Sequence, residues 1–329
     1  MLNCPFLAKM DFVKNIIGQE LKIFEGKFSD AVKSNTAILD RIMKYIIKRK
    51  GKQLRPMFVL LSAKLHGEIN ESTYRAAALV ELLHTATLVH DDVVDESFER
   101  RGFFSINAIW KNKIAVLVGD YLLSKGLLLS TSNADFEHLH ILSEAVKQMS
   151  EGELLQMEKS RKLNLDEDIY FEIIRNKTAS LLSSACAVGA YSTTQDKSIA
   201  DQMKTFGEKV GIAFQIKDDL FDYGTADVGK PTGNDIKEKK LTLPLIYTLN
   251  KIDKATRRSM IYIIKNQNKD KEKVQYVIDT VANSGGIKYA EEKMFQYRDE
   301  ALAILRSFSE SPVRNSLEEL VRFTTDRKY

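Results

Sequence analysis

The sequence is poor in the residues that interrupt helices or cross-link chains. Its 329 residues include five prolines and two cysteines, and no proline lies between Pro56 and Pro231. Because proline removes a backbone hydrogen bond from a helix, its scarcity leaves room for long helices. Apolar residues in the same span recur mostly every three or four positions, which is the period of a helix face. We therefore predict an all-α protein.

The cysteine count and the charge exclude several classes of protein. Cys4 and Cys186 are too few for a disulfide framework or a cysteine-rich zinc site, which fits a reducing cytoplasm. The formal net charge is +4 with the basic residues spread along the chain, so charge does not indicate nucleic-acid binding.

The chain also lacks the features of a targeted or membrane-spanning protein. Residues 1–12 have no basic start followed by an apolar segment, and we find no run of about 20 strongly apolar residues. The best candidate, residues 178–194, is rich in serine, threonine and alanine and is typical of a helix packed inside protein. We expect a cytoplasmic protein without a membrane span.

Several segments have the pattern of buried helices. Residues 74–94 are apolar nearly all round, which is typical of a helix surrounded by other helices. The same character indicates further helices at 113–130, 143–159, 170–190 and 203–224. Residues 225–240 then hold two glycines and a proline among charges, which predicts a mobile loop. Beyond Asn250 the chain is more polar but has no sharp linker, so we expect a single domain over 1–329.

Two of these helices end in acidic clusters. Asp91 and Asp95 are four residues apart, as are Asp218 and Asp222, which have Asp219 beside them. Such a cluster taken alone is more often a solvated helix end. Two clusters that both end buried helices favour a shared site, because like charges on one helix face repel unless a cation lies over them.

The residue types in these clusters indicate a hard divalent metal. Carboxylates facing each other across a helical bundle are ligands for Mg²⁺, which also retains waters and binds substrate phosphates. The segment DDVVDESFERRG lacks the ligand order of a calcium loop, and His84 and His90 have no cysteine partners for zinc. The pattern therefore predicts a diphosphate substrate.

A diphosphate site needs several cations from different segments. Taken singly, each basic residue in this chain is more often a solvated surface charge. The candidates are Lys52, Arg55, Arg100, Arg101, Lys177 with Thr178, Lys230, Lys239 and Lys240.

The order of these motifs resembles that of the trans-isoprenyl diphosphate synthases of the polyprenyl type. The segments GKQLRP, HTATLVHDDVVDESFERRG, VGDYLLSKG, NKTASLL and FQIKDDLFDYGTADVGKPTGNDIKEKKLTLPLI match the family's motifs in order, over about residues 45–250. The resemblance is closest to the bacterial medium- and long-chain enzymes, including octaprenyl diphosphate synthases. It implies an isoprenoid-synthase-type helical bundle around a central cavity.

The resemblance also implies a role for individual residues. The residues implied to bind isopentenyl diphosphate are Lys52, Arg55, His84 and Arg101. Three Mg²⁺ ions are held by Asp91, Asp95 and Asp218, supported by Asp92, Asp219 and Asp222. The allylic diphosphate is surrounded by Arg100, Lys177, Thr178, Gln215, Lys230 and Lys240. The residues closest to the chemistry are Asp91, Asp95, Asp218, Lys177 and Lys240.

Two positions depart from the family pattern. Gln53 replaces a residue that is basic in many relatives, which weakens one expected phosphate contact. Lys239 replaces a common glycine, so the sequence leaves open whether Lys239 or Lys240 faces the site.

The family chemistry begins when diphosphate leaves an allylic carbon. The double bond of isopentenyl diphosphate then attacks the resulting cation, and a proton is lost. Water must be excluded from the site, and residues 225–240 are a candidate lid. Phe214, Phe221 and Tyr223 could face the cation, although packing is the commoner role for such rings.

Product length should depend on the helix before Asp91. Each helical turn climbs about 5.4 Å, close to one isoprene unit. Ala86 and Thr87, one turn before Asp91, are small where short-chain synthases have bulky residues. We therefore expect a product of about C30 to C50, most simply octaprenyl diphosphate for a quinone side chain, with a deeper floor formed by Leu122 or Leu123.

The sequence leaves three alternatives to this function. A short-chain farnesyl or geranylgeranyl diphosphate synthase is the nearest alternative. A terpene cyclase usually lacks the second aspartate cluster, and a silent subunit of a heteromeric synthase usually lacks both. By analogy with the family we expect a homodimer, transient membrane contact at most, and no nucleic-acid partner.

Overall fold

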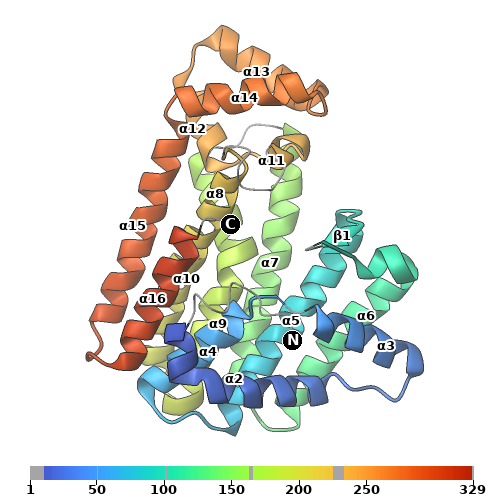
Figure 1. The fold of residues 1–329 in the computed structure, drawn as a ribbon, viewed down its shortest axis with the longest axis vertical. Coiled ribbons are helices and arrows are strands. Elements are labelled where there is room, and N and C mark those ends of the chain that lie inside the picture. The colour runs from blue at the N-terminus through green and yellow to red at the C-terminus, as the bar shows by residue number, and fades with distance from the viewer. Residues whose placement is uncertain (1–10, 50, 101, 163–165, 225–232, 328–329) are drawn as a thin grey trace. The chain divides into compact units, whose positions relative to one another are not determined.

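The computed structural model describes residues 11–49, 51–100, 102–162, 166–224 and 233–327 (Figure 1). The chain is almost wholly helical, which confirms the all-α prediction. The helices are α2 Asp11–Ala31, α3 Ala37–Lys48, α4 Leu54–His66, α5 Glu71–Val94, α6 Ile106–Thr131, α7 Phe136–Lys162, α8 Glu167–Ile174, the π-turn η1 Arg175–Ala179, α9 Ser180–Thr194, α10 Lys197–Phe221, α11 Asn234–Lys237, α12 Leu243–Lys251, α13 Lys254–Asn266, α14 Lys271–Asn283, α15 Gly286–Arg306 and α16 Pro312–Asp326.

The sequence patterns missed three local features. A two-stranded antiparallel hairpin, β1 Glu99–Arg100 and β2 Phe103–Phe104, follows α5. The expected helix at 170–190 is interrupted by η1. The short helix α11 lies within the expected loop at 225–240, of which residues 225–232 lie outside the described part of the chain.

Close contacts divide the chain into two compact units. Unit 1 comprises residues 1–146, 184–204 and 310–317, and unit 2 comprises residues 147–183, 205–309 and 318–329. The expectation of a single domain stays a prediction.

The core of unit 1 is the packed pair α5 and α6, which lie side by side in Figure 1. Its buried apolar cluster includes Leu82, Ala86 and Val89 of α5 and Leu122 of α6. Gly119 on α6 allows the close approach, because a Cβ atom there would lie 2.1 Å from Nε2 of His90. A larger residue at 119 would displace the His90 ring from its place against α6.

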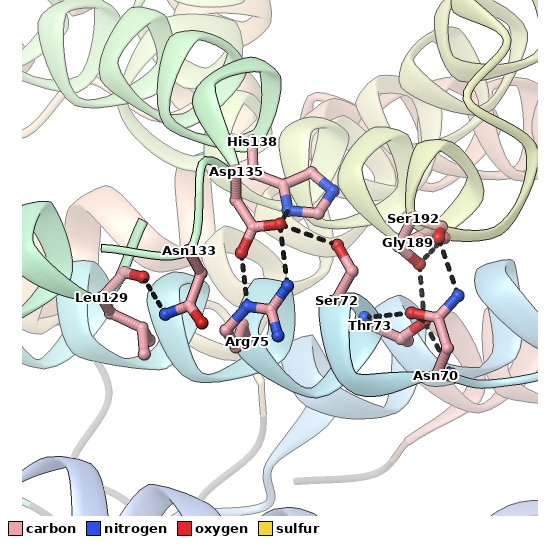
Figure 2. A network of polar contacts seen from close by, with 10 residues as sticks. All are labelled: Asn70, Ser72, Thr73, Arg75, Leu129, Asn133, Asp135, His138, Gly189 and Ser192. Carbon is pink, nitrogen blue, oxygen red and sulfur yellow. Dashed lines mark hydrogen bonds and ion pairs between the residues drawn. The ribbon is translucent and has the colours of Figure 1, made fainter. Parts of the chain in front are cut away.

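A polar network fixes the N-terminus of α5 (Figure 2). Asn70 and Thr73 form a reciprocal capping box, and the Asn70 amide also donates to the Ser192 carbonyl at 3.0 Å. Arg75 donates to both carboxylate oxygens of Asp135, at 2.5 and 3.0 Å. A capping box of this kind satisfies backbone donors that a helix leaves open. The network ties this end of α5 to segments far along the chain.

Helix α6 corrects the expectation that no segment is apolar and long enough to span a membrane. Its 26 residues meet that test by length and composition, although a third of the relevant window is buried in the protein. Ala115, Val118 and Leu122 lie in the unit 1 core. Because these residues pack on α5, we interpret α6 as a bundle helix.

The backbone of α6 is strained near its start. Lys111 has φ 73° and ψ 159° and separates the first helical turn from the rest of α6. This region of φ and ψ is essentially restricted to glycine, and a side chain there costs on the order of 1–3 kcal/mol.

We expect Lys111→Gly to stabilise the protein for this reason. Relief of the strain should raise the thermal midpoint by about 2–4 °C for each kcal/mol recovered, measured by differential scanning calorimetry. Lys113→Gly, two residues further on inside the regular helix, is the matched control and should lower the midpoint. A lower midpoint for Lys111→Gly would show that the kink carries no strain.

Unit 2 has a core of its own. Buried apolar residues from α10, α12, α13 and α14 join Tyr170 of α8 in one cluster, including Ile216, Leu245, Ile264 and Val277. The same cluster places α8 beside the end of α10. The second acidic cluster therefore ends a helix that is buried, as the sequence predicts.

Candidate functional site

The first acidic cluster lies at the C-terminus of α5 in unit 1. The helix ends at Val94, and Asp95 is its C-cap, with its amide donating to the Asp91 carbonyl at 2.8 Å. Asp91 is half-buried and Asp95 is exposed, whereas the Asp92 side chain is only 4% exposed. Asp91 and Asp95 therefore keep the predicted one-turn spacing, and Asp92 points into the protein.

Arg100 holds Asp92 in this position. Two nitrogens of its guanidinium lie 2.7 Å from one oxygen of the Asp92 carboxylate. Asn107 at the start of α6 donates to the Asp92 carbonyl at 3.0 Å and to the Ser97 carbonyl at 3.1 Å. The hairpin and α6 thus fix the end of α5. Arg101 lies outside the described residues.

A second pair of predicted residues meets on α4 and α5. Nη1 of Arg55 lies 2.8 Å from Nε2 of His84, and His84 is only 8% exposed. Lys52 is exposed in the segment before α4, and Gln53 is the N-cap of α4 with φ 53°. The contact brings Arg55 and His84 together as expected for one binding subsite.

The second acidic cluster lies beside a cavity in unit 2. The cavity has a volume of about 230 Å³ and combines aspartates with lysines and neutral hydrogen-bonding groups. Its lining includes six predicted residues, Lys177, Thr178, Gln215, Asp218, Asp219 and Lys240, together with Tyr170 and Asp235, which the sequence analysis did not single out.

A chain of hydrogen bonds orders one wall of this cavity. Thr178 donates to the Gln215 side-chain oxygen at 2.8 Å, and the Gln215 amide donates to Asp219 at 2.8 Å. The buried Tyr170 hydroxyl donates to the other Asp219 oxygen at 2.7 Å. Burial, with the negative charge of Asp235 as a second cause, raises the pKa of Asp219 to about 8. The pKa of Asp235 rises to about 7, again mainly through burial.

Asp222 has a different position from its neighbours. Its carboxylate accepts the backbone amides of Asn234 and Asp235 at 2.8 and 3.0 Å, at the start of α11. Asp222 is absent from the lining of the cavity. Within the described residues it connects the end of α10 to α11.

The structure separates the two neighbouring lysines. Lys240 lines the cavity and pairs with Glu238 at 2.5 Å. Lys239 has φ 59°, and its ammonium group donates to the Lys265 carbonyl at 2.8 Å. Of the two, Lys240 faces the cavity, as the family motif implies. Lys230 lies outside the described residues.

Asp218 carries an ion pair that no local sequence pattern indicates. Nη2 of Arg327 lies 2.6 Å from an Asp218 oxygen, and the Arg327 guanidinium lies over the Phe214 and Phe221 rings at 4.1 and 5.3 Å. Tyr223 is buried, and its hydroxyl lies 2.6 Å from Oγ1 of Thr242. Arg327 therefore lies over both phenylalanine rings, and the Lys217 ammonium group also lies over the Phe221 ring at 5.3 Å.

The π-turn places Lys177 and Thr178 at the cavity. Lys177 forms an ion pair with Glu153 and donates to Gln156 at 3.4 Å. A Cβ atom on Gly211 of α10 would lie 2.5 Å from Cα of Ala179. The π-turn needs this glycine beside it. Single π-turns in α-helices occur frequently at functional sites.

The sequence matches a known protein family. The family model described as polyprenyl synthetase matches residues 36–281. The chain belongs to the polyprenyl synthetase family. It is therefore a prenyltransferase with the all-α isoprenoid synthase fold, which uses isopentenyl diphosphate and an allylic diphosphate and depends on a divalent metal.

Individual relatives match over nearly the whole chain. The all-trans-nonaprenyl-diphosphate synthase of Rhodobacter capsulatus is 34% identical over 97% of this chain and 99% of its own. The octaprenyl diphosphate synthase of Escherichia coli is 30% identical over 97% and 99%. The crystal structure of a Caulobacter crescentus polyprenyl synthase with calcium and isoprenyl diphosphate has a TM-score of 0.90 at 33% identity, over 97% of this chain and 98% of that one.

The residues of the unit 2 cavity fit the metal that the family implies. Among the described residues, no three His, Cys, Asp or Glu side chains converge as ligands. Asp218 is nevertheless neutralised by an arginine, and Asp219 and Asp235 have raised pKa values. Ionised carboxylates at these positions therefore need a nearby cation, and their oxygens are the donor type that Mg²⁺ prefers.

The raised pKa of Asp219 predicts a pH-dependent stability. Its folded-state pKa of about 8 exceeds the ordinary value of 3.8, so its contribution is fully present below pH 4 and is lost as pH rises toward 8. Each unit of pKa difference corresponds to about 1.4 kcal/mol. We expect the thermal midpoint of the wild-type protein, measured without added metal, to fall by several degrees between pH 5 and 8. The thermal midpoint of Asp219→Asn should fall less over the same range. Parallel curves for Asp219→Asn and the exposed control Asp279→Asn would contradict this assignment.

Proposed function

We propose that this enzyme makes an all-trans polyprenyl diphosphate of about C30 to C50, with octaprenyl diphosphate favoured, for the side chain of a quinone. The main support for this chemistry comes from the unit 2 cavity. Its lining combines Asp218 and Asp219 with Lys177, Thr178, Gln215 and Lys240. Cations and hydrogen-bond donors there suit a diphosphate, and the carboxylates suit its counter-ions.

The leaving diphosphate is held by residues that are already charged and placed. Lys177 and Lys240 carry ammonium groups into the cavity, where each pairs with a glutamate, Glu153 or Glu238. The incoming diphosphate takes the place of these glutamates. Fixed positive charge at the oxygens where negative charge develops lowers the barrier to departure. Thr178 and Gln215 orient the same group through their side-chain contacts.

The acidic residues supply the metal sites. We assign Asp91, Asp95 and Asp218 as ligands of three Mg²⁺ ions, with Asp92, Asp219 and Asp222 in support. The bound ions supply Lewis acidity toward the diphosphate oxygens. Asp92 supports the site by accepting a hydrogen bond from Arg100, which positions that arginine. Asp222 supports it by accepting a backbone amide at the start of α11.

We assign isopentenyl diphosphate to a group of residues on and before α4 and on α5 in unit 1. Arg55 on α4, whose guanidinium donates to His84 of α5, and Lys52 on the preceding segment present positive charge. Arg101 belongs to the same assignment. The buried His84 ring contacts the Arg55 guanidinium, whose planar fork can donate two hydrogen bonds to one phosphate group.

The product length rests on α5. Ala86 is completely buried in the cluster that includes Leu122, whereas Thr87 is half-buried and its hydroxyl donates to the His84 carbonyl at 2.9 Å. Of the two small residues, Thr87 therefore lies outside the α5–α6 core. Relatives of this chain are named as synthases of products from geranylgeranyl to nonaprenyl diphosphate, so length requires its own measurement.

The deciding experiment is product analysis. Purified protein is incubated with Mg²⁺, isopentenyl diphosphate and geranyl, farnesyl or geranylgeranyl diphosphate, and product length is read by mass spectrometry. A dominant product of C30 or longer supports the proposal. Products that stop at C15 or C20 would show a short-chain synthase, and the absence of condensation with every primer would indicate a partner-dependent subunit.

We also propose that the enzyme is a cytoplasmic homodimer that contacts membranes only transiently. One exposed side of α6 carries Leu117 and Leu128, each 61% exposed. They are 11 residues, or about three turns, apart on one face, and exposed apolar surface of this kind marks interaction sites.

The dimer makes a direct prediction. The double variant Leu117→Arg and Leu128→Arg should behave as a monomer of half the wild-type mass in light scattering, because buried charges would face each other across the interface. Leu154→Arg, at a leucine that is 67% exposed on α7, is the matched control and should keep the wild-type mass. A wild-type mass for the double variant would place the interface elsewhere.

A further inference from the structure

The hairpin that carries Arg100 is held from outside by α3. Its strands pair Arg100 with Phe103 and Glu99 with Phe104. The Arg49 guanidinium carbon lies 3.4 Å from the centre of the Tyr45 ring and 4.7 Å from that of Phe103. Arg49 is thus sandwiched between the end of α3 and the cross-strand neighbour of Arg100.

Further contacts complete this clamp, which comprises Tyr45, Arg49, Phe103 and Trp110. The Tyr45 hydroxyl donates to the Phe104 carbonyl at 2.5 Å, and its ring meets Trp110 edge to face at 5.2 Å. Trp110 ends the first turn of α6, whose Asn107 bonds to the Asp92 carbonyl. The clamp therefore contacts both segments that fix Asp92.

The hairpin itself is short and largely exposed. Each strand has two residues, and Phe103 and Phe104 are 49% and 62% exposed. A two-stranded hairpin of this size is at best marginally stable by itself in water. In the part of the chain that the structure describes, the buried Nε of Arg49 has no hydrogen-bond partner. The rings therefore hold the guanidinium by stacking, which suits arginine better than lysine.

We propose that Tyr45 and Arg49 are positioning residues for the allylic diphosphate: by clamping the hairpin they keep Arg100 on Asp92, where it is ready to receive the substrate. The inference rests on the proposed role of Arg100. It predicts that loss of the clamp weakens binding of the allylic substrate more than binding of isopentenyl diphosphate. Of the residues assigned to isopentenyl diphosphate, Arg101 directly follows Arg100 in the sequence, whereas Arg55 and His84 lie on α4 and α5.

The test is a kinetic comparison of Arg49→Leu with Lys48→Leu. Lys48 is the exposed neighbour on α3, and its variant loses the same charge without touching a ring. In Arg49→Leu we expect the KM for the allylic diphosphate to rise about tenfold, the size of one desolvated cation–π contact. The KM for isopentenyl diphosphate should rise by a clearly smaller factor, through Arg101 alone. Lys48→Leu should leave both KM values unchanged.

Two further variants distinguish loss of the clamp from a general loss of structure. Tyr45→Phe removes only the hydrogen bond to Phe104 and should raise the same KM by a smaller factor. Arg49→Lys keeps a cation over the rings and should restore part of the loss. Equal rises in both KM values, or equal effects of Arg49→Leu and Lys48→Leu, would overturn the clamp. An inactive wild-type enzyme would instead overturn the proposed function.

Discussion

Asp218→Asn should lower kcat by about a thousandfold or more, the size expected when a group that stabilises developing charge is lost. Asp218 lines the cavity beside Lys177 and Lys240, and its carboxylate already holds a cation, Arg327, at 2.6 Å. Asparagine keeps the size of the side chain but removes the charge. Single-turnover kinetics with saturating Mg²⁺ and both substrates would measure the loss.

Controls separate this effect from misfolding. Asp279→Asn makes the same change at an exposed α14 aspartate that bonds to Gln275, and it should retain wild-type activity. The thermal midpoint of Asp218→Asn should stay within a few degrees of wild type, because Asp218 is partly exposed. A kcat within tenfold of wild type in a folded Asp218→Asn enzyme would remove Asp218 from the metal site.

Thr87→Phe should shorten the product from C30 or longer to about C15 or C20. Thr87 lies one turn before Asp91, so a ring there blocks the growing chain after one or two additions, since one turn matches about one isoprene unit. The half-buried threonine can be enlarged without opening the α5–α6 core. Mass spectrometry of the products made from geranyl diphosphate gives the length distribution.

Thr85 offers a matched control for this change. It is also half-buried on α5, and its hydroxyl donates to the Glu81 carbonyl at 2.7 Å, but it projects from another side of the helix. Thr85→Phe should leave product length unchanged. Ala86→Phe would be a poorer test, because overpacking a filled core costs about 1–3 kcal/mol. Equal products from Thr87→Phe and wild type would mean that the chain runs elsewhere.

The sequence predicted the helices and much of the candidate site because the two depend on local patterns. Apolar periodicity placed α5 and α10, and the acids at their ends fell where expected. Lys177, Thr178 and Gln215 reach one cavity because their motifs lie on adjoining helices. The assignment of the first and second acidic clusters to one metal site stays a prediction.

The remaining features depend on contacts that no local pattern contains. Arg327 reaches Asp218 from 109 residues away along the chain. The π-turn at Lys177 depends on Gly211 of another helix. Tyr170 was missed because a buried tyrosine in an apolar segment has the pattern of ordinary core, and only its partner, Asp219, reveals a role. Periodicity also predicted a helix through residues 170–190 without its change of register.

Helix α5 has consequences for how such enzymes diverge. The Asn70 and Asp135 network anchors one end, and Arg100 and Asn107 fix the other. A residue in the middle turns can therefore be exchanged without moving either end. Mutational drift at a position such as Thr87 would alter which lipid is made while the reacting groups stay in register. If α5 sets product length as proposed, a helix anchored at both ends allows the product length to change in evolution without a change in the reaction.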